Sequence, residues 1–289
     1  MRTEEIPSTA LARQRFPRGL TQPAGGFRFG ADTLLLAAFA ARHLPSPKAT
    51  AAHASGAPAR ITGQAQINGL ELGIGCGAAS LGLLLLRPDL DLRLIGIDTG
   101  PEMVAAARRN AEALDFSDRL QVEEAGVRAF RWPGQAGPKG GNGPEESTGK
   151  GAHLVFSNPP FRLPGTGRAA ATPEKDRARF EGPGGFAAFA QCAARSLRPG
   201  GMFCLMHLAE RLPGLLRDMQ DAGLGPELLL PVQGGADKPA RLVLLLARRG
   251  GRGGLTLEPP LVLYGSDGAL RPEAEAFCPF LATNSRKGL

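Results

Sequence analysis

The feature that most limits the possible folds is an alternation of short apolar runs with helical segments from Gly69 onward. Runs such as LELGI, LRLIGID and HLVF are typical of buried strands, whereas PEMVAAARRNAEAL is typical of a helix. Strands that alternate with helices predict βαβ units and a parallel sheet. Two later runs, ELLLPV and RLVLLLARR, follow each other without a helix between them. They predict an antiparallel edge on a mostly parallel sheet.

The chain is long enough to bury a large core, because 43% of its 289 residues are hydrophobic. We expect residues 1–66 to form a leader with one helix and a linker, and residues 67–289 to form the main domain. The helix is predicted from ADTLLLAAFAARHL, with Asp32 or Thr33 placed to cap it. The Pro/Ala/Ser/Gly-rich stretch 45–66 predicts the linker, and the Gly-rich run 134–151 predicts a surface loop.

Several classes of protein are disfavoured by what the sequence lacks. No stretch reaches the roughly 18 apolar residues that a membrane helix needs, and MRTEEIPSTALARQRF has no apolar block of a signal peptide. We therefore expect a cytoplasmic protein with no membrane partner. The four cysteines lack CxxC spacing and the four histidines are scattered, so we expect reduced thiols and no metal.

The balance of charge is basic, with a formal net charge of +7 and a pI near 9.7. This balance favours a polyanionic partner, although it also fits a compositional bias toward arginine. Arginines gather in three places, and each gathering alone is more often a solvated surface than a binding site. They are Arg13, Arg15, Arg18 and Arg28; Arg162, Arg168, Arg177 and Arg179; and Arg248, Arg249 and Arg252.

A glycine-rich turn predicts a nucleotide-like ligand at the end of the first strand. Glu71-Leu72-Gly73-Ile74-Gly75-Cys76-Gly77 follows an apolar run and opens a helix, where glycines permit a tight turn and a close ligand. Asp98 ends the next strand, where a carboxylate can accept hydrogen bonds from ribose hydroxyls. The plainer interpretation is a tight turn with Asp98 capping the next helix.

The same turn also satisfies the dinucleotide fingerprint GxGxxG/A, which leaves an NAD-dependent oxidoreductase as an alternative. Glu71 favours a different ligand. A carboxylate just before the glycines suits a ligand that bears a positive methionine moiety better than a pyrophosphate, which it would repel.

A second motif, Ser157-Asn158-Pro159-Pro160-Phe161, comes directly after the apolar run HLVF and separates these alternatives. The prolines fix φ and remove two N–H donors, so the turn offers carbonyl oxygens and the Asn158 amide as acceptors. Such acceptors could hold the two hydrogens of an amine, and Phe161 could stack on a base. An oxidoreductase leaves this motif without a role. The plainer interpretation is a rigid loop with Phe161 in the core.

Together these residues resemble the class I S-adenosylmethionine-dependent methyltransferases with an Asn-Pro-Pro-aromatic motif. Within that group the chain resembles the family of the bacterial tRNA1(Val) adenine-N6 methyltransferase. Three stretches carry the resemblance: GFRFGADTLLLAAFA, SNPPF, and KPARLVLLLARRGGRGGLTLEPPLVLYGSDG. The resemblance implies a Rossmann-like fold with a seven-stranded sheet, S-adenosylmethionine as cofactor, and an RNA substrate, foremost tRNA near the anticodon.

The resemblance also implies roles for individual residues. Asn158, Pro159, Pro160 and Phe161 would orient the target adenine, and Asp98 would hold the ribose of the cofactor. The remaining cofactor-binding residues would be Glu71, Gly73, Gly75, Gly77, Phe29, Asp32 and Thr33. The sequence reads Glu123-Glu124-Ala125 after the third strand, so Glu124 or backbone groups would contact the cofactor's adenine. Three alternatives stay open: an rRNA substrate, a protein glutamine side chain as in release-factor methyltransferases, and an RNA-binding protein without activity.

Overall fold

The structure of the chain is a computed structural model that describes residues 9–24, 28–45, 66–133, 151–159 and 184–284. The predicted linker 45–66 and the predicted loop 134–151 lie almost wholly outside the described residues.

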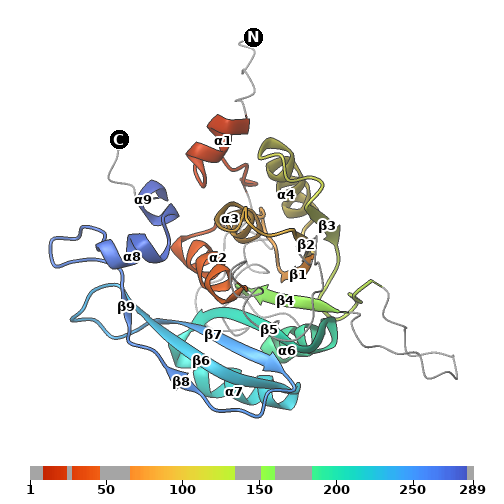
Figure 1. Cartoon of the computed structure of the whole chain (residues 1–289), viewed down its shortest axis with the longest axis vertical. Helices are drawn as coiled ribbons and strands as arrows, with labels where there is room; N and C mark the ends of the chain where they lie inside the picture. The colour runs from red at the N-terminus through yellow and green to blue at the C-terminus, as the bar shows by residue number, and fades with distance from the viewer. Residues whose placement is uncertain (1–8, 25–27, 46–65, 134–150, 160–183, 285–289) are drawn as a thin grey trace, which may run out of the picture.

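A twisted sheet forms the centre of the molecule, with the strand order β3-β2-β1-β4-β5-β7-β6-β8 and β9 paired to β6 (Figure 1). Strands β1 to β5 pair in parallel, and β7 runs antiparallel between β5 and β6. Two short strands, β8 and β9, pair in parallel with β6. The strands are β1 Ile67–Leu72, β2 Leu92–Asp98, β3 Leu120–Glu124, β4 Ala152–Ser157, β5 Leu197–Leu208, β6 Leu224–Gln233, β7 Leu242–Arg249, β8 Thr256–Leu257 and β9 Leu261–Val262.

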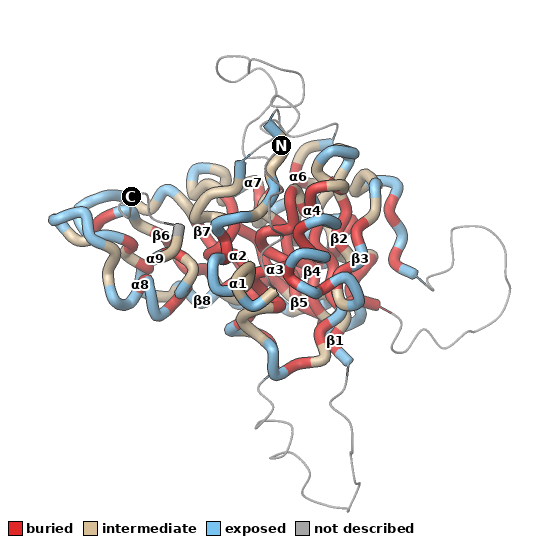
Figure 2. Tube along the Cα trace, turned by 90° about the horizontal axis from the view of Figure 1, so that it is seen from above, coloured by how far each residue is buried: buried red, intermediate tan, exposed pale blue. Residues whose placement is uncertain are grey.

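Helices cover both faces of this sheet, and the buried residues concentrate between the layers (Figure 2). One face packs against α2, α3, α4, α8 and α9, and the other packs against α6 and α7. None of the described helices is long and apolar enough to cross a membrane. The helices are α1 Thr9–Arg15, α2 Ala31–His43, α3 Ala78–Leu86, α4 Pro101–Ala113, α6 Gly185–Ser196, α7 Leu212–Asp221, α8 Pro272–Phe277 and α9 Phe280–Asn284, with a short 3-10 turn at Ala209–Arg211.

The predicted fold class is confirmed, with two refinements. The described sheet contains β8 and β9 in addition to the seven predicted strands, and the antiparallel strand β7 lies two positions inside the edge, because β6 and then β8 or β9 lie beyond it. A dinucleotide-binding sheet has the order 3-2-1-4-5-6 with all its strands parallel. The insertion of β7 between β5 and β6 therefore separates this fold from that of the NAD-dependent oxidoreductases.

The leader packs on the same face of the sheet as α3. Helix α2 carries an unbroken buried run from Thr33 to Ala41. The Arg87 guanidinium, at the end of α3, donates hydrogen bonds to the carbonyl oxygens of Ala41, Leu44 and Pro45 and so satisfies the C-terminal end of α2. The division of the chain at residue 66 stays a prediction.

The predicted cap of α2 was wrong. The N-cap residue is Gly30, and no side chain caps the helix there. Asp32 and Thr33 instead lie inside the first turn, where Asp32 Oδ1 accepts a hydrogen bond from the Thr33 N–H at 2.9 Å. A helix pattern locates such a boundary only to within a few residues. Because Asp32 and Thr33 do not cap the helix, Asp32 Oδ2 and Thr33 Oγ1 are available for contacts with other parts of the chain.

Candidate active site

The glycine turn leaves β1 at the point where the strand order reverses, which is where ligands bind in open α/β sheets. Gly73, Gly75 and Gly77 all have positive φ, at 74°, 56° and 88°. Side chains with a Cβ rarely adopt these conformations, which explains the three glycines. A Cβ added at Gly75 would meet nothing within 4 Å, so the backbone there borders open space.

The Ile97 carbonyl and the Ile74 side chain hold the glycine turn in this shape. The N–H groups of Gly73 and Ile74 both donate to the Ile97 carbonyl at 2.9 Å. Ile74 is buried against β2, where a Cβ on Gly96 would come within 2.1 Å of its Cδ1. Gly96 therefore differs from the glycines of the turn, because it is needed for the space that it leaves to the Ile74 side chain. The sequence analysis did not single it out, because a glycine inside a strand has no fixed meaning by itself.

Asp98 joins two turns at the carboxyl end of β2. Its Oδ2 accepts a hydrogen bond from the Gly75 N–H and its Oδ1 accepts one from the Gly100 N–H, both at 2.9 Å. Burial raises the pKa of Asp98, although these bonds oppose the rise. A carboxylate has about four lone-pair sites, so Asp98 can order the glycine turn and still accept further donors.

Glu71 is buried at the end of β1, with 2% of its surface exposed. Its Oε2 accepts hydrogen bonds from the backbone N–H of Ser80 at 3.0 Å and from the Ser80 hydroxyl at 2.5 Å. Burial raises the pKa of Glu71 to about 8. The carboxyl group thus connects β1 to the start of α3, and its predicted contact with a cofactor stays a prediction.

Asn110 holds the leader against the glycine turn. From helix α4, its side-chain amide donates to the carbonyl oxygens of Cys76 at 2.8 Å and Thr21 at 3.0 Å. Its Oδ1 accepts a hydrogen bond from the Thr21 N–H at 2.7 Å. Phe29 packs beside this point against a small buried cluster formed by Cys76, Ala78 and Ala106. Asn110 was missed because nothing near it in the sequence points to residue 21 or residue 76.

The Asn-Pro-Pro turn follows β4, the strand next to β1. Ser157 is buried and donates a hydrogen bond from its hydroxyl to the Leu72 carbonyl at 2.8 Å. Neighbouring strands are roughly 4.8 Å apart, so Gly73 and Asn158, each the first residue after its strand, lie side by side. The glycine turn and the Asn-Pro-Pro turn therefore meet at one edge of the sheet.

Asn158 faces the leader with one end of its amide, and the other end has no partner among the described residues. Its Nδ2 donates to Thr33 Oγ1 at 3.0 Å and to Asp32 Oδ2 at 3.3 Å. Its Oδ1 is buried and has no hydrogen-bond partner within the described part of the chain. A buried acceptor without a partner costs about 1–3 kcal/mol. It therefore marks a place where a donor from a ligand would be stabilising.

Other predicted site residues are placed less fully. Pro159 is buried beside Asn158, whereas Pro160, Phe161 and the arginines from Arg162 to Arg179 lie outside the described residues. Glu124 pairs in register with Asp98 at the end of β3 and is exposed. Its contact with a cofactor adenine stays a prediction.

Several of the clustered arginines have structural partners. Arg13 donates to the carbonyl oxygens of Leu114 and Asp115 and stacks over the Phe116 ring. Arg248 pairs with Glu227 at 2.7 Å, and Arg249 donates to the Leu197 carbonyl. Part of the basic charge thus serves the fold itself. Within the described residues, no group of three or more His, Cys, Asp or Glu side chains could hold a metal ion.

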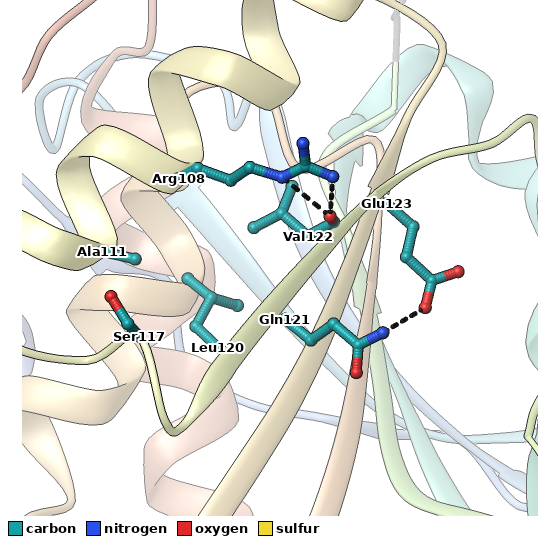
Figure 3. Close-up of a pocket in the computed structure, with 7 residues that line it drawn as sticks. All are labelled: Arg108, Ala111, Ser117, Leu120, Gln121, Val122 and Glu123. Atoms are coloured by element: carbon teal, nitrogen blue, oxygen red, sulfur yellow. Dashed lines mark hydrogen bonds between the residues drawn. The ribbon is translucent and has the colours of Figure 1, made fainter.

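A groove of about 380 Å³ lies between α4 and the edge strand β3 (Figure 3). The Arg108 guanidinium crosses it and donates from Nη2 and Nε to the Val122 carbonyl, at 2.7 and 3.2 Å. Strands β2 and β1 separate β3 from β4, a distance of roughly 14 Å at 4.8 Å per strand. The groove is therefore separate from the site at Asn158.

The sequence is similar to curated proteins named tRNA1(Val) (adenine(37)-N6)-methyltransferase. It is 28% identical to the one from Dickeya chrysanthemi (strain Ech1591), over 62% of this chain and 65% of that protein. It is 30% identical to the one from Klebsiella pneumoniae (strain 342), over 52% of this chain and 54% of that protein. It is 25% identical to the one from Yersinia pestis (strain Pestoides F), over 73% of this chain and 77% of that protein. The chain thus spans less than two thirds of the length of the first two relatives. No family model matches this sequence.

Solved structures agree with the fold. A protein from Agrobacterium tumefaciens, described as a predicted O-methyltransferase, matches 86% of this chain and 96% of its own length at a TM-score of 0.57 and 18% identity. A Listeria monocytogenes protein described as a putative class I S-adenosylmethionine-dependent methyltransferase matches 97% of this chain and 80% of its own length. The TM-score is 0.55 and the identity is 13%. The chain therefore has the class I methyltransferase fold and resembles, in sequence, the tRNA1(Val) adenine-N6 methyltransferases.

Proposed function

We propose that this protein transfers a methyl group from S-adenosylmethionine to the exocyclic N6 amine of an adenine in RNA, and that the RNA is a tRNA modified near the anticodon. The observation that carries the proposal is the buried Oδ1 of Asn158, which lacks a hydrogen-bond partner among the described residues and lies beside the glycine turn. The names of the relatives support the choice of adenine and of tRNA.

The residues around the glycine turn fit S-adenosylmethionine. Gly75 borders open space, so the backbone there leaves room for a bound molecule. Asp98 retains lone pairs that can accept hydrogen bonds from ribose hydroxyls. Phe29, which packs against Cys76, Ala78 and Ala106, would close the site from the leader. When bound, this cofactor supplies a methyl group on a positively charged sulfur, which accepts the C–S bonding electrons as a nitrogen lone pair forms the C–N bond.

The contribution of the chain is to hold the amine. Asn158 Oδ1 and the Pro159 carbonyl would accept its two hydrogens, which favours a pyramidal nitrogen with its lone pair directed at the methyl group. Such catalysis works by positioning and by dipoles aimed at developing positive charge. The surplus proton on the methylated nitrogen leaves to water. Phe161 would stack on the extruded base, by analogy with aromatic residues that bind single strands.

A protein glutamine side chain is the second candidate, since its amide offers a similar planar amino group to the same two acceptors. The open Oδ1 of Asn158 suits either group equally. The relatives and the basic net charge favour RNA. Because several arginines are engaged within the fold, the charge contributes less to this preference than the relatives do.

The test is an incubation of purified protein with methyl-labelled S-adenosylmethionine and tRNA lacking its natural modifications, followed by nucleoside analysis. We expect label in N6-methyladenosine. Asn158→Ala should lower the rate by about 100-fold, the scale of losing one directed hydrogen-bonding group in an active site. Asn68→Ala is the matched control, because the Asn68 side chain makes an exposed hydrogen bond with Gln66 at the start of β1.

Calorimetry with S-adenosylhomocysteine should find the same affinity for the wild type and Asn158→Ala. Cofactor binding without label in any RNA would favour a peptide amide as acceptor. Equal rates for the wild type and Asn158→Ala would remove Asn158 from the mechanism.

A further inference from the structure

The leader and the Asn-Pro-Pro turn meet at the side-chain amide of Asn158, and neither stretch of sequence predicts this contact by itself. Asn158 is separated from Thr33 by 125 residues and from Asp32 by 126, yet its Nδ2 lies within hydrogen-bond distance of both. Thr33 is buried, with 8% of its surface exposed. The first turn of α2 thus contacts the amide that the proposed reaction depends on.

The chemistry of these contacts fixes which end of the amide faces α2. An ionised carboxylate only accepts hydrogen bonds, so the group that faces Asp32 must be the Asn158 NH2. Rotating the amide by half a turn would bring Oδ1 against the Asp32 carboxylate and leave Nδ2 pointing into the site. An amine donor there would then meet a second donor in place of an acceptor.

The backbone of the leader makes room for this arrangement. Asp32 Oδ1 is held by the Thr33 N–H, which leaves Oδ2 for Asn158. A Cβ on Gly30 would come within 2.8 Å of Asp32 Oδ1. The absence of a side chain at the N-cap therefore leaves space for the carboxylate between the helix end and Asn158.

We propose that Asp32 and Thr33 are positioning residues that orient the Asn158 amide, so that its Oδ1 is presented to the substrate amine. This inference rests on the proposed function and refines it, since the resemblance gives both residues a role in closing the cofactor site. The two roles predict different kinetics. A residue that orients Asn158 affects kcat, whereas a residue that binds the cofactor affects its Kd and KM.

The variants are Thr33→Val, which removes the hydroxyl at nearly constant volume, and Asp32→Asn, which allows the facing group to donate. Each should lower kcat for RNA methylation by about five- to tenfold, the effect of about one hydrogen bond. Their Kd for S-adenosylhomocysteine should stay within twofold of the wild type. Thr33→Ser, which keeps the acceptor, should restore most of kcat. Unchanged kcat with a weakened Kd would overturn the inference and return both residues to the cofactor.

A second measurement does not need activity. The chain has five asparagines, at positions 68, 110, 142, 158 and 284. Selective ¹⁵N labelling of asparagine therefore gives a simple spectrum of side-chain amides, in which Asn158→Ala identifies the signal of Asn158. Thr33→Val should move this signal upfield and speed its exchange with water, while the Asn110 signal stays in place as a control for folding.

An Asn158 signal that is unmoved in both Thr33→Val and Asp32→Asn would refute the positioning role, whatever the kinetics. If the wild type methylates no RNA, the proposed function fails, and the amide spectrum alone then decides whether the leader orients Asn158.

Discussion

A carboxyl group that is fully enclosed, as Glu71 is, should make the stability of the protein depend on pH. Its pKa in the fold is about 8, whereas an unfolded chain has a glutamate pKa near 4.3. Between these values the folded protein binds a proton that the unfolded chain has lost. The free energy of unfolding must therefore fall as pH rises from about 4.3 through 8.

Glu71→Gln removes this dependence while keeping an oxygen that can accept from Ser80. We expect the Tm of Glu71→Gln minus that of the wild type to increase steadily from pH 5 to pH 8 and to level off above. Thermal unfolding across this pH range measures the difference, with Glu112→Gln on the surface of α4 as a control for lost charge. A difference that is constant with pH would mean that Glu71 is ionised throughout.

Gly96 should tolerate no side chain. A Cβ there would lie 2.1 Å from Cδ1, 2.9 Å from Cγ1 and 3.0 Å from Cβ of Ile74, so a rotation of the Ile74 side chain alone cannot relieve the contact. Gly96→Ala should lower the free energy of unfolding by about 1–3 kcal/mol, as overpacking of a core does. Gly214→Ala, where a Cβ in α7 meets nothing within 4 Å, should be neutral or stabilising. Urea unfolding of both variants checks the contrast.

For single residues, the sequence predicts a role where that role depends on residues nearby in the chain. The positive φ angles of Gly73, Gly75 and Gly77 follow from one local turn, and the place of Asp98 follows from the end of one strand. Asn110 and Gly96 act through residues far away in the sequence, so no local pattern reveals them. The prediction that Asp32 or Thr33 caps α2 failed because the helix begins at Ala31. Their contacts with Asn158, which lies 126 and 125 residues away, were equally hidden from a local pattern.

Among the elements, the leader depends on Asn110 for its attachment to the glycine turn. Asn110→Ala removes three hydrogen bonds and leaves the buried Cys76 carbonyl without its donor. We expect a loss of at least about 2 kcal/mol in the free energy of unfolding. Limited proteolysis should also cut the leader before the rest of the chain, with products identified by mass spectrometry.

Asn68→Ala again serves as the matched control and should resemble the wild type in both measurements. If Asn110→Ala loses stability while the leader stays as resistant as in the wild type, Asn110 supports α4 rather than the leader.

The order of helices and strands was predictable because each has its own periodicity. The runs LRLIGID and AHLVFS are found as β2 and β4, and LELGI overlaps the end of β1. The run PEMVAAARRNAEAL contains the whole of α4. The two-residue strands β8 and β9 were not predicted, since so few residues establish no period. They exist because their backbone groups pair with the outer edge of β6.

Considered as a whole, the molecule keeps its four cysteines out of reach of solvent. All four are free and buried, and burial raises the pKa of Cys76, Cys204 and Cys278 to about 12. Because the thiolate is the reactive form, Ellman's reagent should label the folded protein far more slowly than the protein in guanidinium, where four thiols should react at once. Rapid labelling of one thiol in the folded protein would reveal local opening near that cysteine.

The arrangement of the sheet could be predicted only in part. A parallel sheet with an antiparallel strand follows from the spacing of the runs, but the insertion of β7 between β5 and β6 depends on packing between distant segments. The return of the C-terminal helices to the leader is of the same kind. Phe280 packs edge-on against Phe16 with ring centroids 4.7 Å apart, and Thr283 donates to the Phe16 carbonyl.

Because α8 and α9 pack on the leader, the leader cannot complete its packing until the C-terminal end of the chain has been synthesised. Cys278 donates to the Leu34 carbonyl from 244 residues away, a stretch that takes roughly 12 to 50 s to translate at 5–20 residues per second. During that time the apolar face of α2 has been made but lacks α8 and α9, which cover part of it. A nascent chain released before α9 would carry Asn158 beside a leader that is still incompletely packed, so premature termination should yield a protein with an unfinished site.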